Sequence, residues 1–181
     1  MAKSAATYYW DSCMFYEHLG DEPVTATKKA AVQEILQANE KGENLIVTSA
    51  VTHLEVLPTK LDGKGAADDA DYLALFDGSH FVDVELGANI ALLAREIRDF
   101  YYVPADALGQ GGKMMDLGDS IHLATAIIHK VDEFHTRDND KKGQKVPLLT
   151  LNSISPEGKV CGKYDLKIVS PESDQGDLLN G

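Results

Sequence analysis

Four acidic residues stand where a parallel sheet would bring their side chains together. Asp11 directly follows an apolar, aromatic run, and Glu55 lies about two turns beyond the end of a second apolar run. Asp119 stands at the start of a segment with helical spacing, and Asp138 follows closely after a further apolar run. Ligands of open parallel sheets bind outside the carboxyl ends of the strands. If the first strand is central, the four carboxylates could therefore converge at one edge of the sheet.

Carboxylates that converge need a positive charge between them. Two of them about 4 Å apart repel by roughly 4 kcal/mol at an effective dielectric constant of about 20. Hard oxygen ligands without His or Cys suit Mg²⁺ or Mn²⁺ rather than zinc. An ion held in this way can bind a phosphate and lower the pKa of an attacking water. The residues thus indicate metal-assisted hydrolysis of a phosphodiester, provided that the four side chains meet.

Each acid also has an interpretation that involves no metal. Asp11 could cap the helix that follows it, and Asp119 could be a first-turn residue that the helix dipole favours. Glu55 could be a solvated helix residue, although its neighbours in the chain are of the type found in cores. Asp138 could be a turn residue, since Asp and Asn favour turns. The nearby His122 is interpreted as an ordinary helix residue.

The surrounding pattern predicts one α/β domain. Short apolar runs alternate with segments of helical spacing, which is typical of a mostly parallel sheet with helices on both faces. We expect the domain to span residues 1–171, with a polar tail at 172–181 and a Gly-rich loop at 103–113. Expected strands are 6–10, 45–47, 81–84, 134–136 and 168–169, with a further short strand at 148–151; expected helices are 12–19, about 26–40, 48–57, 70–76, 86–101 and 117–128.

The overall charge restricts the partners. The 181 residues include 29 Asp and Glu against 17 Lys and Arg, so the formal net charge is −12. A protein this acidic repels nucleic acid at long range, and binding would need a locally basic surface or a bound cation. Arg137, Lys141, Lys142 and Lys145 form a basic segment beside Asp138 that could hold an RNA backbone. A solvated basic loop explains them equally well.

We expect a cytoplasmic protein with no membrane contact. The longest apolar run, around 123–128, is far short of the roughly 20 residues that span a bilayer. Residues 1–7 contain one lysine and no apolar stretch, so they lack the pattern of a signal peptide. Without an export signal, Cys13 and Cys161 are expected to be reduced thiols.

The chain resembles the PIN-domain ribonucleases, and among them the VapC-type toxins of bacterial and archaeal toxin–antitoxin pairs. The similarity spans about residues 6–171, and no single motif within it is specific. The pieces that carry it, in the order of the family, are YYWDS at 8–12, TSAVTHLEV at 48–56, GDSIHLATA at 118–126 and HTRD at 135–138, while IVSP at 168–171 is similar to the family's last strand.

The resemblance implies a three-layer α/β/α sandwich and a metal-dependent endoribonuclease. It also implies an RNA substrate, an antitoxin partner and a homodimer. The residues that match the acids of the family, which bind Mg²⁺ or Mn²⁺, are Asp11, Glu55, Asp119 and Asp138. Ser12 resembles the hydroxyl residue after the first acid, Thr136 resembles the one before the last acid, and Asp140 is a candidate supporting acid.

Two other functions are compatible with the residues. A protein of this fold that no longer cleaves could bind RNA or a partner protein and use its acids only for stability. A phosphotransfer enzyme with Asp11 as nucleophile would need a second acid two residues later, and position 13 is a cysteine, which argues against it. Cleavage of RNA that depends on the acids would separate the ribonuclease from the binding module.

Overall fold

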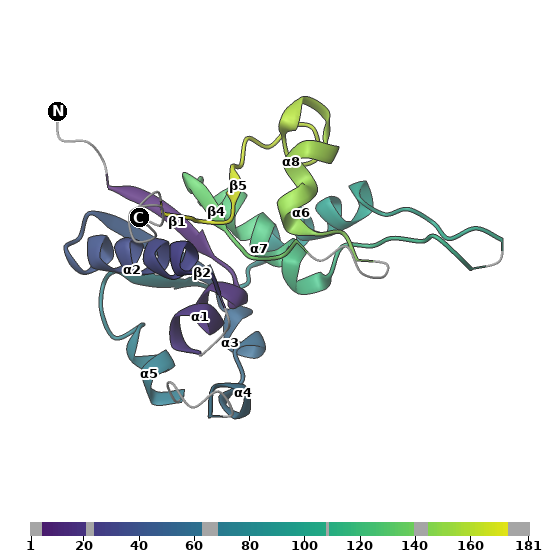
Figure 1. The fold of residues 1–181 in the computed structure, drawn as a ribbon. Coiled ribbons are helices and arrows are strands. Elements are labelled where there is room, and N and C mark those ends of the chain that lie inside the picture. Colours follow the sequence, from purple (N-terminus) through teal and green to yellow (C-terminus); the bar gives the residue numbers. More distant parts are fainter. Residues whose placement is uncertain (1–4, 21–23, 63–68, 108, 140–144, 174–181) are drawn as a thin grey trace, which may run out of the picture.

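A five-stranded parallel sheet lies at the centre of the molecule (Figure 1). This computed structural model describes residues 5–20, 24–62, 69–107, 109–139 and 145–173. The strands pair in the order β3-β2-β1-β4-β5, and every pair is parallel. Because β1 is central, the residue after it stands in the middle of the edge where ligands of such sheets bind. The strands are β1 (Ala6–Trp10), β2 (Asn44–Ser49), β3 (Phe81–Val84), β4 (Glu133–His135) and β5 (Ile168–Val169).

Alternate residues of the strands face two separate cores. Tyr9 and Val47 belong to one core, which also contains side chains of the two helices that follow β3. Trp10 and Ile46 belong to the other, which is shared with helices that follow β1 and β2. Successive side chains of a strand point to opposite faces of its sheet, so the two cores lie on opposite faces. The expected three-layer α/β/α sandwich is confirmed.

The helices are distributed accordingly over the two faces (Figure 1). The larger helices are α1 (Ser12–Leu19), α2 (Ala26–Glu40), α5 (Asp69–Ala74), α6 (Ala88–Phe100) and α7 (Leu117–Ile128). Short helical segments are α3 (Thr52–Glu55), α4 (Pro58–Asp62), η1 (Leu148–Thr150), α8 (Leu151–Ile154) and η2 (Pro156–Gly158). The side chains of α6 and α7 pack against one core, and those of α1, α2 and α5 against the other.

Two expectations about elements are wrong. The helix expected at 48–57 is broken, because Thr48 and Ser49 still belong to β2 and Pro58 begins a separate helix, where a missing backbone N–H costs nothing. The strand expected at 148–151 is instead a helical turn. Leu148 and Leu151 are both buried there, and a spacing of three residues suits one face of a helix rather than the alternation of a strand.

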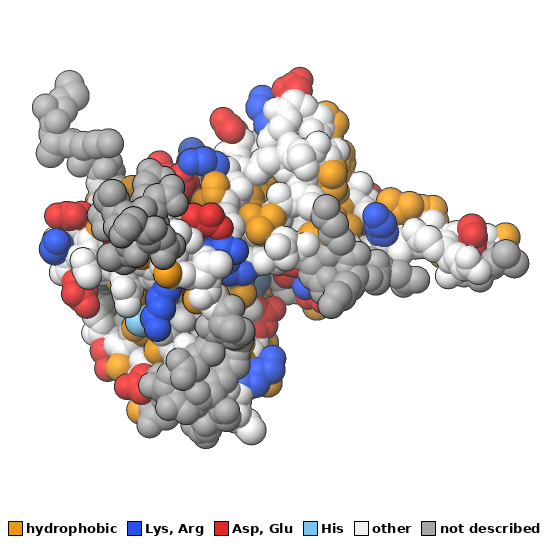
Figure 2. All heavy atoms as spheres, in the orientation of Figure 1, with side chains coloured by type: hydrophobic (Ala, Val, Ile, Leu, Met, Phe, Trp, Pro, Cys, Tyr) orange, Lys and Arg blue, Asp and Glu red, His pale blue; other side chains and the backbone are white. Residues whose placement is uncertain are grey.

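The segment expected as a Gly-rich loop is a two-armed extension that projects from the body of the molecule (Figure 1). Val103 and Lys113 exchange two backbone hydrogen bonds of 2.9 Å across its base. Figure 2 shows apolar side chains along this projection, and Tyr102, Val103 and Met114 are each about half exposed. No helix in the described part of the chain is long and apolar enough to span a membrane. The expected polar tail falls mostly outside the described residues.

Candidate active site

Asp11 is positioned by the end of the central strand and the start of α1. It is the N-cap of this helix, and only 6% of its surface is exposed. The backbone N–H and the thiol of Cys13 both donate to its Oδ1, over 3.2 and 2.7 Å. Burial raises the pKa of Asp11, while hydrogen bonds from Cys13 and Thr136 oppose the rise. Asp11 thus caps a helix, as the alternative interpretation expected, and also lies at the ligand-binding edge of the sheet.

Glu55 is held by a buried histidine of α7. Nε2 of His122 lies 2.9 Å from Oε2 of Glu55, and the hydroxyl of Tyr9 lies 2.8 Å from Nδ1 on the other side of the ring. A carboxylate only accepts hydrogen bonds, so Nε2 of His122 carries the proton in this contact. Burial by itself would raise the pKa of Glu55, yet the hydrogen bonds from His122 and Ser12 leave it below its ordinary value.

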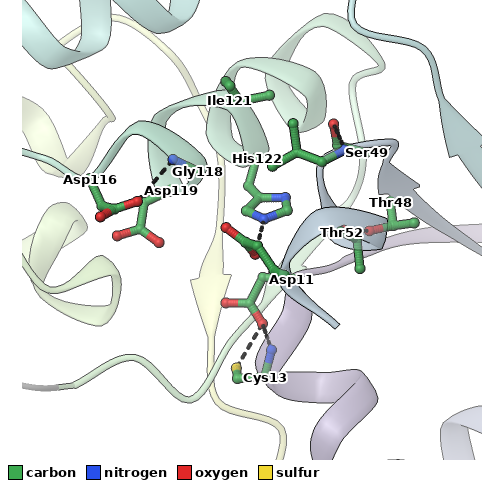
Figure 3. A network of polar contacts seen from close by, with 12 residues as sticks. Asp11, Cys13, Thr48, Ser49, Thr52, Asp116, Gly118, Asp119, Ile121 and His122 are labelled. Carbon is green, nitrogen blue, oxygen red and sulfur yellow. Dashed lines mark hydrogen bonds and ion pairs between the residues drawn. The ribbon is translucent and has the colours of Figure 1, made fainter. Parts of the chain in front are cut away.

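The first turn of α7 lies directly against Glu55. A Cβ atom placed on Gly118 would collide with Oε1 of Glu55, so any other residue at this position would displace the Glu55 carboxylate. Asp116 caps the same turn and accepts from the N–H of Gly118 over 2.9 Å. Asp119 follows immediately, so the cap and the glycine together fix where its carboxylate points. Figure 3 shows Asp11, Asp116, Asp119 and His122 around this junction of the strand end and α7.

Asp119 is paired with a lysine rather than with a hydrogen-bonding network. Nζ of Lys145 lies 3.0 Å from its Oδ2, a buried oxygen without any other partner among the described residues. Burial raises the pKa of Asp119 to about 6, against the opposing effect of Lys145 and with smaller contributions from Asp138 and Asp116. The carboxylate is therefore short of positive charge even with Lys145 beside it.

Asp138 follows β4 and fastens the segment beyond it. Its backbone N–H donates to the hydroxyl of Thr136 over 2.9 Å, and its Oδ2 accepts from the backbone N–H of Leu148 over 3.2 Å. Asp138 also acts electrostatically on both Asp119 and Lys145. The last acid thus belongs to the same electrostatic group as the third.

The comparison of the chain with protein families agrees with this geometry. The family model described as the PIN domain matches residues 8–145, which include all four acids. The chain belongs to the PIN domain family. No curated protein matches it.

Two solved structures that are similar to this chain are complexes. One is VapBC2 from Rickettsia felis bound to a DNA fragment from the promoter, with a TM-score of 0.55, 13% identity, and coverage of 92% of this chain and 99% of that chain. The other is a toxin–antitoxin complex from Klebsiella pneumoniae, with a TM-score of 0.46, 20% identity, and coverage of 77% and 95%. At these identities the Rickettsia structure bears on the fold alone.

The other expected site residues of the PIN domain differ in their surroundings. Ser12 hydrogen-bonds to Glu55, the second acid, rather than to the first. Thr136 supports both Asp11 and the backbone of Asp138. Asp140, Lys141 and Lys142 lie outside the described residues, so their roles stay predictions.

The guanidinium group of Arg137 is held by hydrogen bonds within the protein. It donates to both carboxylate oxygens of Glu17, over 2.5 and 2.9 Å, and to Oγ of Ser170 and the carbonyl of Pro171, over 2.7 and 2.8 Å. These bonds tie the end of β4 to α1 and to the segment after β5. A contact of Arg137 with an RNA backbone stays a prediction.

Sequence reasoning missed three residues that complete the site. His122 reaches Tyr9 across 113 positions of the chain, and Cys13 receives the N–H of Arg137 across 124 positions, so no local signal reveals these contacts. In the sequence, Lys145 is only one of several cations in a basic segment. The structure makes it the partner of Asp119.

The donor set of this PIN domain fits a hard divalent cation. Its carboxylate oxygens are the ligands that Mg²⁺ and Mn²⁺ prefer, and the buried, otherwise unpartnered Oδ2 of Asp119 faces an ammonium group. Among the described residues, no three His, Cys, Asp or Glu side chains are grouped closely enough to hold an ion as they stand. The chemistry of the donors thus fits a cation, while Asp119 is paired with Lys145 in the structure.

Proposed function

We propose that this PIN domain is a metal-dependent endoribonuclease that hydrolyses phosphodiester bonds of RNA. The observation that supports this best is the position of the acids at the carboxyl ends of neighbouring strands and at the first turn of α7. His122 links Glu55 to the central strand, and Lys145 links Asp119 to Asp138. Asp11, Glu55, Asp119 and Asp138 are the proposed metal ligands, and the ion is Mg²⁺ or Mn²⁺.

The residues of the chain have distinct parts in the proposed reaction. When bound, the ion would polarise the phosphodiester and lower the pKa of the attacking water. Glu55, whose pKa is held low, offers a carboxylate that is ionised and oriented by His122. Asp11 is oriented by Cys13. Burial excludes water from Asp11 and His122, which strengthens the electrostatic interactions at the reacting phosphate.

A groove beside the acids offers a path for the RNA backbone. It has a volume of about 630 Å³ and is lined by Arg98, Lys113 and Lys145, with Asp116 at the end nearest to Asp119. Three cations here provide the local positive charge that an RNA-binding protein with a net charge of −12 requires. Lys141 and Lys142 are proposed to extend this surface.

We further propose that the protein acts as the toxin of a toxin–antitoxin pair in the cytoplasm. The fold that it shares with VapBC2, described as bound to promoter DNA, supports an antitoxin partner. The half-exposed apolar side chains of the projecting extension support a protein–protein contact, and we propose that a homodimer also forms.

The decisive experiment measures RNA cleavage by the purified protein with Mg²⁺, with Mn²⁺ and with EDTA. Asp11→Asn and Asp119→Asn are each expected to reduce cleavage by at least about a hundredfold, since a neutral amide cannot replace a carboxylate ligand. Asp99→Asn, on the exposed side of α6, is the matched control and should cleave like the unmodified protein. Cleavage that persists in EDTA or in both site variants would refute the mechanism. An antitoxin added to the same assay should stop the reaction.

A second candidate function is the binding module that does not cleave. The pairing of Asp119 with Lys145 favours it, because the acids are partly neutralised by the protein itself. Tight RNA or partner binding, with no cleavage in the presence of any divalent ion, would establish this function instead.

A further inference from the structure

Lys145 pairs with one of the acids and acts electrostatically on three others. Its Nζ is 3.0 Å from Oδ2 of Asp119. It also interacts electrostatically with Asp138 and Asp116, and it is among the charges that lower the pKa of Glu55. A single ammonium group thus acts on four of the carboxylates at this edge of the sheet.

The backbone holds Lys145 in this place. It forms a parallel β-bridge with Met114, two residues before Asp116, the cap of α7. The segment after Lys145 is anchored in turn, because Val146 and Leu148 are buried in the core that contains α6 and α7. The lysine is therefore placed next to Asp119 by its own bridge to Met114 and by the anchored segment that follows it.

The two ends of the ion pair differ in their surroundings. The side chain of Asp119 is 14% exposed and that of Lys145 is 42% exposed. An ordinary surface ion pair contributes little to stability, and neither of its charges depends on the other as a buried carboxylate would. Here the ammonium group is the sole partner, within the described part of the chain, of a buried oxygen, so its loss leaves a desolvated charge without that compensation.

Lys145 also has space to move. It lines two neighbouring grooves, of about 640 and 630 Å³, one beside Phe100 and Ile154 and the other beside Tyr102 and Asp116. Because Lys145 lines both grooves, its long side chain borders open space into which it could turn on leaving Asp119. In one of these grooves it would stand beside the proposed path of the RNA backbone.

We propose that Lys145 is an intrinsic competitor of the divalent cation, an ammonium group that occupies the cation position among the acids and must leave Asp119 before the ion is held. The inference takes the identity of the ion from the proposed function, but it concerns binding and not cleavage. It agrees with the pairing of Asp119 with Lys145, and with the finding that no three acids among the described residues are grouped closely enough to hold an ion.

The test is the affinity for Mn²⁺ alone, measured by titration calorimetry in the absence of RNA. Lys145→Met should bind Mn²⁺ at least about tenfold more tightly than the unmodified protein, because the ion no longer displaces a charge. Lys113→Met is the matched control, since Lys113 lines the same two grooves and has no ion pair with the acids among the described residues. It removes the same net charge and should change the affinity by no more than about twofold.

Thermal unfolding gives a second readout, in which Lys145→Met is expected to lower the melting temperature without metal and to increase the stabilisation by Mn²⁺. Without metal, Lys145→Met should melt at a lower temperature than the control, because Asp119 loses its partner. With Mn²⁺, its melting temperature should rise by more than that of the unmodified protein. Lys145→Gln, which keeps a polar side chain, should behave in the same way and serves if the Met variant does not fold.

Two outcomes would overturn the inference. One is equal or weaker Mn²⁺ binding by both Lys145 variants, or no binding by any variant. The other is an equal gain in affinity for Lys145→Met and Lys113→Met, which would reduce the effect to net charge. Failure of RNA cleavage would leave these binding results intact, so the two proposals can fail separately.

Discussion

The carboxyl groups of Asp11, Glu55 and Asp119 differ in their pKa values because they differ in their partners. Burial raises the pKa of Asp11 and Asp119, whereas His122 and Ser12 hold the pKa of Glu55 below its ordinary range. Asp119 is paired with Lys145 and lies near Asp138 and Asp116, and burial raises its pKa to about 6. Its protonation state therefore changes close to neutral pH.

Folding stability should depend on the protonation of Asp119. Its pKa is about 6 in the folded protein and 3.8 when unperturbed, so the folded state binds this proton more tightly. The resulting stabilisation is present below pH about 4 and is lost as the pH rises through about 6, with a magnitude of up to about 3 kcal/mol. We expect unmodified protein to lose this stability relative to Asp119→Asn between pH 4 and 8.

Urea unfolding of both proteins at five pH values, in EDTA, measures this difference. Other titrating groups contribute equally to the two proteins and cancel. Asp99→Asn, exposed on α6, should show a constant difference from the unmodified protein. A constant difference for Asp119→Asn as well would contradict the raised pKa.

His122 should act as a positioning residue for Glu55. His122→Ala removes the donor that orients the carboxylate, and groups that support metal ligands typically affect metal affinity or activity by about 10- to 100-fold. We expect kcat for RNA cleavage to fall in this range while KM stays nearly unchanged. His122→Gln, which keeps an N–H donor, should recover part of the loss.

The matched control is His129→Ala, at the exposed end of the same helix. It should have normal kcat and KM. A variant His122→Ala with normal kcat, or one in which Gln recovers nothing, would show that His122 only fills the core.

At the scale of elements, the site depends on how closely α7 approaches α3. The N-terminal turn of α7 carries Asp116, Gly118 and Asp119, and the absence of a side chain at Gly118 lets Glu55 lie against it. Cys13 supplies a second junction, since its thiol joins Asp11 at the start of α1 to the backbone after β4. Acids from separate elements are thus held at fixed positions by two short contacts.

Gly118→Ala tests the first junction. Alanine stabilises an ordinary helix by about 1 kcal/mol relative to glycine. Here the added Cβ would collide with Oε1 of Glu55, so we expect net destabilisation of about 1–3 kcal/mol and reduced RNA cleavage. Thermal unfolding measures the first effect.

Gly78→Ala is the control for this substitution, because a Cβ there meets no atom within 4 Å. It should leave stability unchanged or slightly raised. If Gly118→Ala were more stable than the unmodified protein, the Glu55 side chain would move aside easily, and its close packing against Gly118 would be unimportant.

At the scale of the whole molecule, the two cores and the charge distribution serve different purposes. The cores on both faces hold the central strand, so the acids stand on a rigid edge. The negative charge of the chain as a whole disfavours nucleic acid, and the cations that oppose it are gathered near the acids, at Arg98, Lys113 and Lys145. The projecting extension after α6 adds apolar surface beyond the cores.

The sequence by itself determined the class of fold and placed acids after its strands, while their role as metal ligands stays a prediction. Strand and helix periodicity is local, and Asp11 follows its strand directly, so both could be predicted without coordinates. Predictions from local patterns were wrong around Pro58 and Leu148, where the structure has short helical turns and not the expected helix and strand. Those turns follow the packing of buried side chains.

Only the tertiary structure decided what holds each acid in place. Tyr9 and His122 are 113 positions apart, and Cys13 and Arg137 are 124 apart, so their contacts exist only once the sheet has formed. The pairing of Lys145 with Asp119 likewise depends on a bridge to the segment before α7. Hydrogen bonds and ion pairs depend on distance in space, and a sequence specifies only separation along the chain.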